Sequence, residues 1–289
     1  MKPILVCEDN DDLIRKFRGE AIVVRTTDPD AVGHFKRVIE EENKVHCIEL
    51  ISEENLTNIE PRDEWKNVPM HIHAPKMGHF LDFVRIRHLL GPLSIRVFLN
   101  SQYDEVYTDL QLMASLGINC GLTFDSAPIN WEECSDLMDF VMYPKVPRAT
   151  VEPFHFIITE YQPKEFINFS GVYFNNPEKY LHIDKDENVA LTSELMKKKE
   201  FIFTGLDQIE NYKKHGSYLS YFQKWKKKFQ KITACSSCPA WRICGGFFEE
   251  RIATNPGCSA AFSELIDAAD LHYHNKSKDQ QNQMQLCQL

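Results

Sequence analysis

Apolar and polar positions alternate with two different periods between residues 21 and 143. Short β-branched runs predict strands, and apolar residues three and four positions apart predict amphipathic helices. Because strands that alternate with helices pair in parallel through right-handed crossovers, this order predicts an α/β fold. The predicted strands cover residues 21–26, 45–51, 70–75, 94–100, 119–125 and 139–143. The predicted helices between them cover residues 28–39, 80–90, 107–116 and 130–138.

Two topologies share this alternation, and the spacing alone leaves both open. Six strands suit a partial (βα)6 barrel of the TIM type, and an open flavodoxin-like sheet is the alternative. Residues 144–180 hold five prolines and many aromatic residues, which indicate a bridge between the strand–helix region and the rest of the chain. The glycine-rich patterns that cradle nucleotide phosphates are absent from the sequence, so it predicts no nucleotide site.

The last third of the chain is predicted to be helical over residues 201–212, 218–232 and 260–272. The middle helix carries an apolar stripe surrounded by lysines, which predicts a solvated face or, alternatively, a site for an acidic partner. Residues 275–289 are polar and glutamine-rich, so they are predicted to form a disordered tail in which Cys287 has no role. The stripe consists of Leu219, Phe222, Trp225, Phe229 and Ile232.

Composition and charge narrow the classes of function. The 289 residues are 43% hydrophobic, which is enough for a sizeable core, and the formal net charge is −9. This acidic balance argues against a general nucleic-acid-binding protein. No apolar run approaches the length of a transmembrane helix, and the N-terminus becomes acidic too soon for a signal peptide. We therefore expect a cytoplasmic protein with neither nucleic acid nor membrane as a partner.

Four cysteines near the end of the chain have the spacing of a metal site. Cys235 and Cys238 are separated by two residues, Cys244 follows after five more, and Cys258 after thirteen more. Prolines and glycines beside them favour the turns that let thiolates converge. Because thiolates are soft ligands, the candidates are an iron–sulfur cluster or Zn²⁺. The five-residue gap suits a zinc ribbon poorly, and two disulfides are a further alternative that a reducing cytosol disfavours.

The segment from Cys235 to Gly246 resembles the SPASM domain of radical-SAM peptide-modifying enzymes, where Cys-x2-Cys-x5-Cys precedes Gly-Gly and a later lone cysteine. The resemblance implies that the chain carries one auxiliary [4Fe-4S] cluster. The implied ligands are Cys235, Cys238, Cys244 and Cys258.

The same resemblance implies that a second auxiliary cluster is lost. Its ligand three residues beyond the third cysteine is replaced by Phe248. The hairpin that precedes this cluster in the family corresponds to residues 180–192. Glu187 stands there where glycine is usual, and Thr192 where cysteine is usual.

Catalytic radical-SAM enzymes also carry Cys-x3-Cys-x2-Cys after the first barrel strand, where three thiolates leave one iron open for S-adenosylmethionine. The chain therefore resembles a pseudo-radical-SAM protein, with a degenerate barrel over residues 1–165 and a SPASM-like domain over residues 166–274. This implies a non-catalytic subunit that binds a ribosomally made precursor peptide, a true radical-SAM enzyme, or both, and binds no S-adenosylmethionine. The upstream cysteines, which do not form the motif, are Cys7, Cys47, Cys120 and Cys134.

A histidine cluster supports a different hypothesis. His71 and His73 alternate on a predicted strand and so face the same side, with His79 close behind. Barrel hydrolases hold a catalytic metal in this way, with a carboxylate such as Asp125 from a later strand end. A metal-bound water would then be the nucleophile of a metal-dependent hydrolase. The histidines could instead line a cavity, and a free-standing electron-transfer or peptide-binding module is a third hypothesis.

Overall fold

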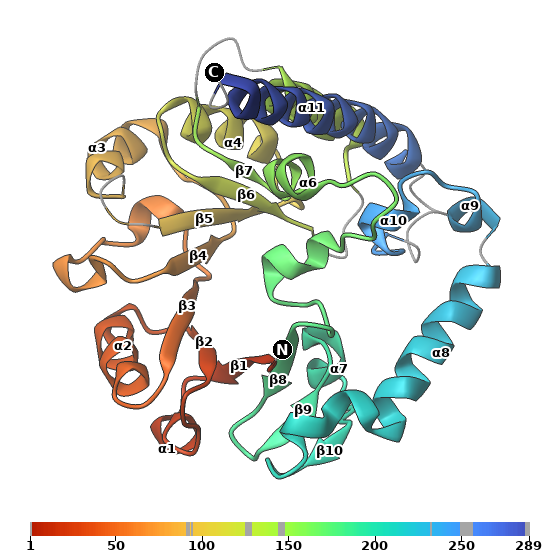
Figure 1. The fold of residues 1–289 in the computed structure, drawn as a ribbon. Helices are drawn as coiled ribbons and strands as arrows, with labels where there is room; N and C mark the ends of the chain where they lie inside the picture. Colours follow the sequence, from red (N-terminus) through yellow and green to blue (C-terminus); the bar gives the residue numbers. More distant parts are fainter. Residues whose placement is uncertain are drawn as a thin grey trace.

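The described strands form one sheet in a largely sequential order (Figure 1). This computed structural model describes residues 2–90, 93, 95–124, 129–143, 148–231, 233–248 and 257–286. The sheet has ten strands in the order β10-β9-β8-β1-β2-β3-β4-β5-β6-β7. Strands β1 to β7 are parallel, β8 joins β1 in parallel, and β9 and β10 continue in antiparallel pairs. The bounds are Ile4–Glu8 (β1), Ala21–Thr26 (β2), Lys44–Ile51 (β3), Met70–Ala74 (β4), Ile95–Asn100 (β5), Cys120–Thr123 (β6), Val151–Glu152 (β7), Tyr180–Ile183 (β8), Asn188–Ala190 (β9) and Phe203–Thr204 (β10).

Helices cover the outer side of these strands. Parallel strands in sequence order, joined by crossovers of one hand, place the connecting helices on one face of the sheet. Figure 1 shows α2, α3 and α4 on that side, whereas the turn η4 that precedes β8 lies on the opposite side. The α-helices are Asp11–Ile14 (α1), Val32–Glu40 (α2), Phe80–Leu90 (α3), Val106–Ser115 (α4), Trp131–Met142 (α5), Phe154–Glu160 (α6), Ser193–Lys197 (α7), Gly216–Lys231 (α8), Thr233–Ser236 (α9), Trp241–Cys244 (α10) and Cys258–Leu286 (α11). The 3-10 helices are Pro29–Ala31 (η1), Leu56–Asn58 (η2), Asp63–Trp65 (η3), Phe169–Tyr173 (η4) and Ile209–Lys214 (η5).

The two faces of the sheet differ in chemistry. Successive side chains of a strand point to opposite faces, so each strand contributes to both. The outer face is apolar and packs against the helices in the main core; Leu5, Val24, Ile48, Ile72 and Val97 represent it. The inner face, opposite the helices, carries a line of ionisable residues that we call the charged row. Its members are Glu8, Arg25, Glu49, His71 and Arg96, each the register partner of the next across β1 to β5.

The predicted α/β class is confirmed by this mostly parallel sheet. The flavodoxin-like alternative is wrong, because such a sheet reverses its strand order at a switch point, whereas β1 to β7 follow one another without a reversal. The predicted strands over residues 21–26, 45–51, 70–75, 94–100 and 119–125 correspond to β2 to β6.

Some local predictions are wrong. Residues 139–142 are helical rather than extended, because α5 continues past Met138 with no glycine or proline to stop it. The predicted helix over residues 201–212 is replaced by β10 and η5, separated by a left-handed Gly205 at φ +83°. Helix α11 runs through residues 275–286, which were predicted to be disordered, and no glycine or proline interrupts it. Cys287 lies outside the described residues.

The predicted boundary at residue 165 does not separate two sheets. The predicted hairpin over residues 180–192 is confirmed as β8 and β9, but β8 pairs with β1 and so extends the sheet formed by the first part of the chain. Strand β1 is absent from the predicted strands, because a short apolar run followed by acidic residues has little periodicity. Residues on both sides of the predicted boundary therefore build the inner face.

Candidate functional site

Glu49 is the centre of a buried polar network on the inner face. Its side chain is 2% exposed, its Oε2 accepts a hydrogen bond from Arg25 Nε at 2.5 Å, and its Oε1 lies 3.0 Å from His73 Nε2. Burial alone would raise the pKa of Glu49, but the charge of Arg25 and the hydrogen bond from His73 outweigh it and hold that pKa well below its usual range. Glu49 is therefore ionised near neutral pH, and His73 must carry its proton on Nε2 to donate to it.

Two further histidines of the inner face are kept neutral. Burial lowers the pKa of His71 and that of His182 to about 3 each. Arg25 Nη1 lies 3.2 Å from His182 Nδ1, so this nitrogen accepts the hydrogen bond and Nε2 carries the proton. Within the described part of the chain, His71 Nδ1 and His182 Nε2 are buried with no hydrogen-bond partner. Such orphan polar atoms are uncommon in folded proteins and mark places where a ligand can complete the bonding.

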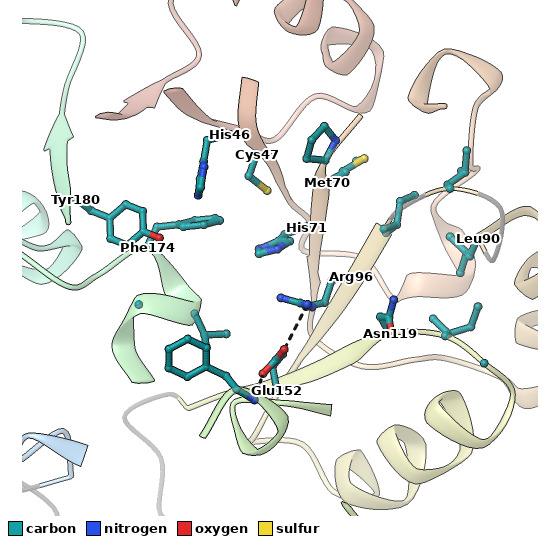
Figure 2. Close-up of a pocket in the computed structure, with 18 residues that line it drawn as sticks. His46, Cys47, Met70, His71, Leu90, Arg96, Asn119, Glu152, Phe174 and Tyr180 are labelled. Atoms are coloured by element: carbon teal, nitrogen blue, oxygen red, sulfur yellow. Dashed lines mark hydrogen bonds and ion pairs between the residues drawn. The ribbon is translucent and has the colours of Figure 1, made fainter. Parts of the chain in front are cut away.

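Two cavities open on the inner face, one at each end of the strands. The carboxyl-end cleft has a volume of about 1040 Å³ and is lined by Glu8, Arg25, Glu49, His73 and Phe98 among others. The amino-end cavity has a volume of about 480 Å³ and is lined by His46, His71, Arg96, Glu152 and Phe174 among others (Figure 2). The charged row thus runs between a larger opening and a smaller one.

Glu49, His71 and His73 form a possible metal-binding group. One potential donor atom from each lies within 4.8 Å of the other two, and no other set of three in the described residues is that close. An ionised carboxylate and a neutral imidazole are the protonation states that a cation such as Zn²⁺ requires. Arg25 already bonds the second oxygen of Glu49, as groups around metal-bound carboxylates do.

This group contains only two of the residues that the histidine hypothesis named. His71 and His73 come together as the sequence predicted, but His79 is 70% exposed and lies 3.8 Å from Asp82 in helix α3. Asp125 lies outside the described residues. Glu49 was missed, although a single charged residue inside the apolar run Cys-Ile-Glu-Leu-Ile was the signal that could have indicated it.

The four C-terminal thiols lie between α9 and the start of α11. Cys235 lies in α9, Cys244 ends α10, and Cys258 begins α11. Burial raises the pKa of Cys258, and the nearby Cys238 and Cys235 raise it further, so these sulfurs lie within electrostatic reach of one another. All four are free cysteines, so the two-disulfide alternative is wrong for this structure.

The spacing of these thiols bears on which metal they suit. A tetrahedral Zn²⁺ with bonds of about 2.3 Å holds its sulfur ligands about 3.8 Å apart. No three of the four thiols lie within 4.8 Å of one another in the described structure. A four-iron cluster spreads its thiolates farther apart than a single ion does, because each binds a different iron. The choice between an iron–sulfur cluster and Zn²⁺ stays a prediction.

Phe248 and the other described cysteines belong to the core. Phe248 is 1% exposed and packs edge-on against Phe124 with ring centroids 5.0 Å apart. Burial raises the pKa of Cys7, Cys120 and Cys134, so these thiols stay protonated in the core. Cys47 is likewise buried, and its pKa is raised well above its usual value.

The segment after the first strand contains no thiol. Two residues, Asp9 and Asn10, separate β1 from α1. Asn10 Oδ1 accepts a hydrogen bond from Leu13 N–H at 2.9 Å and so caps the short helix. The chain therefore passes from β1 into α1 through a capped helix start that offers no thiol ligand.

Comparison with protein-family models, with curated proteins and with solved structures found no match to this chain. None of the described helices has the length and apolar character needed to cross a membrane. The inference of function therefore depends on the residues and their geometry.

Proposed function

We propose that the protein is a pseudo-radical-SAM subunit that assists in the maturation of a ribosomally made peptide without catalysing the radical step. One contrast carries this proposal. Four thiols gather between α9 and α11, while the short segment after β1 has none. The chain would thus hold one auxiliary [4Fe-4S] cluster and lack the site that binds S-adenosylmethionine.

The fold supports the proposal at the level of topology. Seven parallel strands in sequence order, with β8 against β1, are compatible with the partial barrel that the resemblance implies. Enzymes built on such barrels place their sites at the carboxyl ends of the strands. The carboxyl-end cleft lies there, and its volume of about 1040 Å³ is large enough for several residues of an extended peptide. We assign the cleft to the precursor peptide or to the contact with a true radical-SAM enzyme.

The hairpin of β8 and β9 supports the correspondence with the SPASM domain. Glu187 adopts φ +63°, in the left-handed region that favours glycine, and glycine is the usual residue there in the family. Thr192, which stands where cysteine is usual, accepts a hydrogen bond from Leu195 N–H at 3.2 Å and caps α7. A former ligand position thus has a structural role, in keeping with the loss of one cluster.

The donor chemistry of Cys235, Cys238, Cys244 and Cys258 fits such a cluster. When bound, a cluster with four thiolate ligands supplies electron transfer or folding energy and offers no open iron. The chain's own contribution is to orient the sulfurs. Gly246 N–H lies 3.3 Å from Cys244 Sγ and donates to it. Trp225 Nε1–H donates to the Gly245 carbonyl at 3.0 Å and so attaches α8 to the same loop.

The metal content gives the first test. Protein purified without oxygen should contain about four irons and equivalent sulfide per chain. Cys244→Ser should abolish this, whereas Cys134→Ser, in the core of α5, should not. Stoichiometric zinc without iron after anaerobic reconstitution would contradict the cluster and leave a structural zinc site.

The partner gives the second test. The protein should co-purify with a radical-SAM enzyme encoded beside it or bind that enzyme's precursor peptide. Alone, with strong reductant and S-adenosylmethionine, it should form no 5′-deoxyadenosine above background. Turnover by the isolated protein would refute the pseudoenzyme assignment.

A metal-dependent hydrolase is the second candidate, because Glu49, His71 and His73 bring three donor atoms within 4.8 Å. This candidate requires metal-dependent hydrolysis that is lost in His71→Ala and in His73→Ala. His79→Ala is the matched control, because His79 is 70% exposed and outside the group. Hydrolysis that survives both changes would remove the candidate.

A further inference from the structure

The amino-end cavity contains an arginine and a histidine that lie side by side on neighbouring strands. Arg96 on β5 is the register partner of His71 on β4, so both side chains point to the inner face. Figure 2 shows the two side chains extending into the same space, with Glu152 of β7 beside the guanidinium group. This end of the strands is opposite to the carboxyl-end cleft assigned above.

An ion pair orients Arg96, but not all of its N–H donors have an acceptor. Its Nη2 lies 3.3 Å from Glu152 Oε1, and Glu152 Oε2 accepts a second hydrogen bond from Phe156 N–H at 2.9 Å. In the described part of the chain, Arg96 Nε and His71 Nδ1 are both buried with no hydrogen-bond partner. A buried polar group without a partner is costly, because it has lost water and gained no bond in return. Arg96 Nε is such a donor, and His71 Nδ1 is a second one in the tautomer that carries its proton there.

The other walls of the cavity combine polar residues such as His46 and Asn119 with apolar side chains. Phe174 stacks on His71 with ring centroids 5.1 Å apart and an interplanar angle of 12°. Leu90, Ile95 and Phe156 line the same space. A volume of about 480 Å³ that brings apolar side chains and convergent polar groups together has the character of a small-molecule site.

We propose that this cavity binds a small organic acid with an apolar body. The carboxylate accepts hydrogen bonds from the Arg96 guanidinium and from His71 Nδ1–H, while the hydrocarbon part packs against Phe174 and Phe156. Arginine is suited to a carboxylate because its planar fork matches the two oxygens. A dianionic phosphate fits less well, since Glu152 already lies against Arg96 and only one guanidinium lines the cavity among the described residues.

The test compares an acid with its neutral isostere. Binding of phenylacetate and of phenylacetamide to the full chain is measured by titration calorimetry and by saturation-transfer NMR. We expect phenylacetate to bind at least about tenfold more tightly, because only the acid matches the charge of Arg96. Equal affinities would mean that the cavity is merely apolar and would overturn the proposal, as would no binding of the acid at its highest soluble concentration.

Two variants locate the site. Arg96→Lys keeps the charge but removes the fork and should weaken phenylacetate binding at least about tenfold. The matched control Arg85→Lys, on the exposed side of α3, should leave the affinity unchanged.

His71→Leu provides an independent readout if Arg96→Lys fails to fold. It should weaken the binding of phenylacetate relative to that of phenylacetamide. Unchanged acid binding in a folded variant at either position would contradict the assignment. The assay needs no cluster, peptide or partner, so its failure leaves the proposed function intact.

Discussion

The four-thiol segment and the charged row are both possible sites, but they are built in opposite ways. The thiols come from 24 consecutive residues, 235 to 258, and lie in the short helices α9 and α10, in the turn between them and at the start of α11. The charged row takes one residue from each of five strands and is fixed by the backbone hydrogen bonds between them. The first is local in sequence, whereas the second is dispersed in sequence and is fixed by strand register.

This difference has a physical consequence for stability. In a site made from a local segment, metal binding supplies part of the folding energy. A site built on adjacent strands exists before any ligand arrives, because the sheet positions its side chains. Removing a ligand should therefore disorder the thiol segment and leave the charged row in place.

The largest expected effect separates the two regions directly. Cys235→Ala should abolish metal binding and unfold the segment from α9 to the start of α11. Hydrogen exchange should show this segment losing protection while β1 to β5 keep theirs. Cys7→Ala is the control, because Cys7 is buried in the core and should leave the metal content unchanged. Loss of protection in the strands as well would mean that the two regions fold as one unit.

The second expected effect concerns the buried pair of the charged row. Glu49→Gln leaves the Arg25 charge without its partner and should lower the free energy of unfolding by about 3–5 kcal/mol. Denaturant unfolding followed by circular dichroism measures it. The matched control is Glu41→Gln, whose partner Arg15 is on the surface, and it should cost less than about 1 kcal/mol. Equal costs for the two changes would show that burial adds nothing to the inner pair.

The third effect is a dependence of stability on pH. The pKa values of His71 and His182 are about 3 in the folded protein, below the value of about 6.5 in an unfolded chain. The unfolded state therefore takes up protons first, so stability is fully present above about pH 6.5 and falls as the pH drops. Each histidine should contribute roughly 1.4 kcal/mol per pH unit below that point. The lowered pKa of Glu49 adds a loss only below about pH 4.3.

Unfolding measured between about pH 6.5 and 4.5 tests this dependence, since that window lies below the pKa of an unfolded histidine. His71→Asn should reduce the slope by roughly 1.4 kcal/mol per pH unit, while His79→Asn should not change it. An unchanged slope in His71→Asn would mean that His71 is protonated when folded.

The smallest expected effect tests whether α8 supports the thiol segment. Trp225→Phe removes the hydrogen bond to the Gly245 carbonyl, and it should cost about 1 kcal/mol. Hydrogen exchange in residues 241–246 should rise, and bound metal should be released faster, with the strands unaffected. If the strands respond as strongly as the loop, α8 supports the sheet rather than the metal segment.

A sequence pattern indicates one of these regions more readily than the other, for a physical reason. The spacing of Cys235, Cys238, Cys244 and Cys258 predicts that they form a group without knowledge of the fold. The alignment of Arg25, Glu49 and Arg96 in one row depends on strand register, which residue patterns do not reveal. His71 and His73 could be grouped because residues two apart on one strand share a face. The error at residues 139–142 arose because a short apolar run suits a strand and a helix end equally well.

The pairing of β8 with β1 has a consequence for synthesis of the chain. β1 lies between β2 and β8, but its second partner begins only at Tyr180. At about 5–20 residues per second, a ribosome completes β8 roughly 10–35 s after β1. During that interval one edge of an apolar strand has no partner from its own chain, and such an edge can pair with other chains. The first strand of a nascent chain therefore needs protection until β8 has been synthesised. The yield of the protein in cells should accordingly depend more on the supply of chaperones than on the stability of the finished fold.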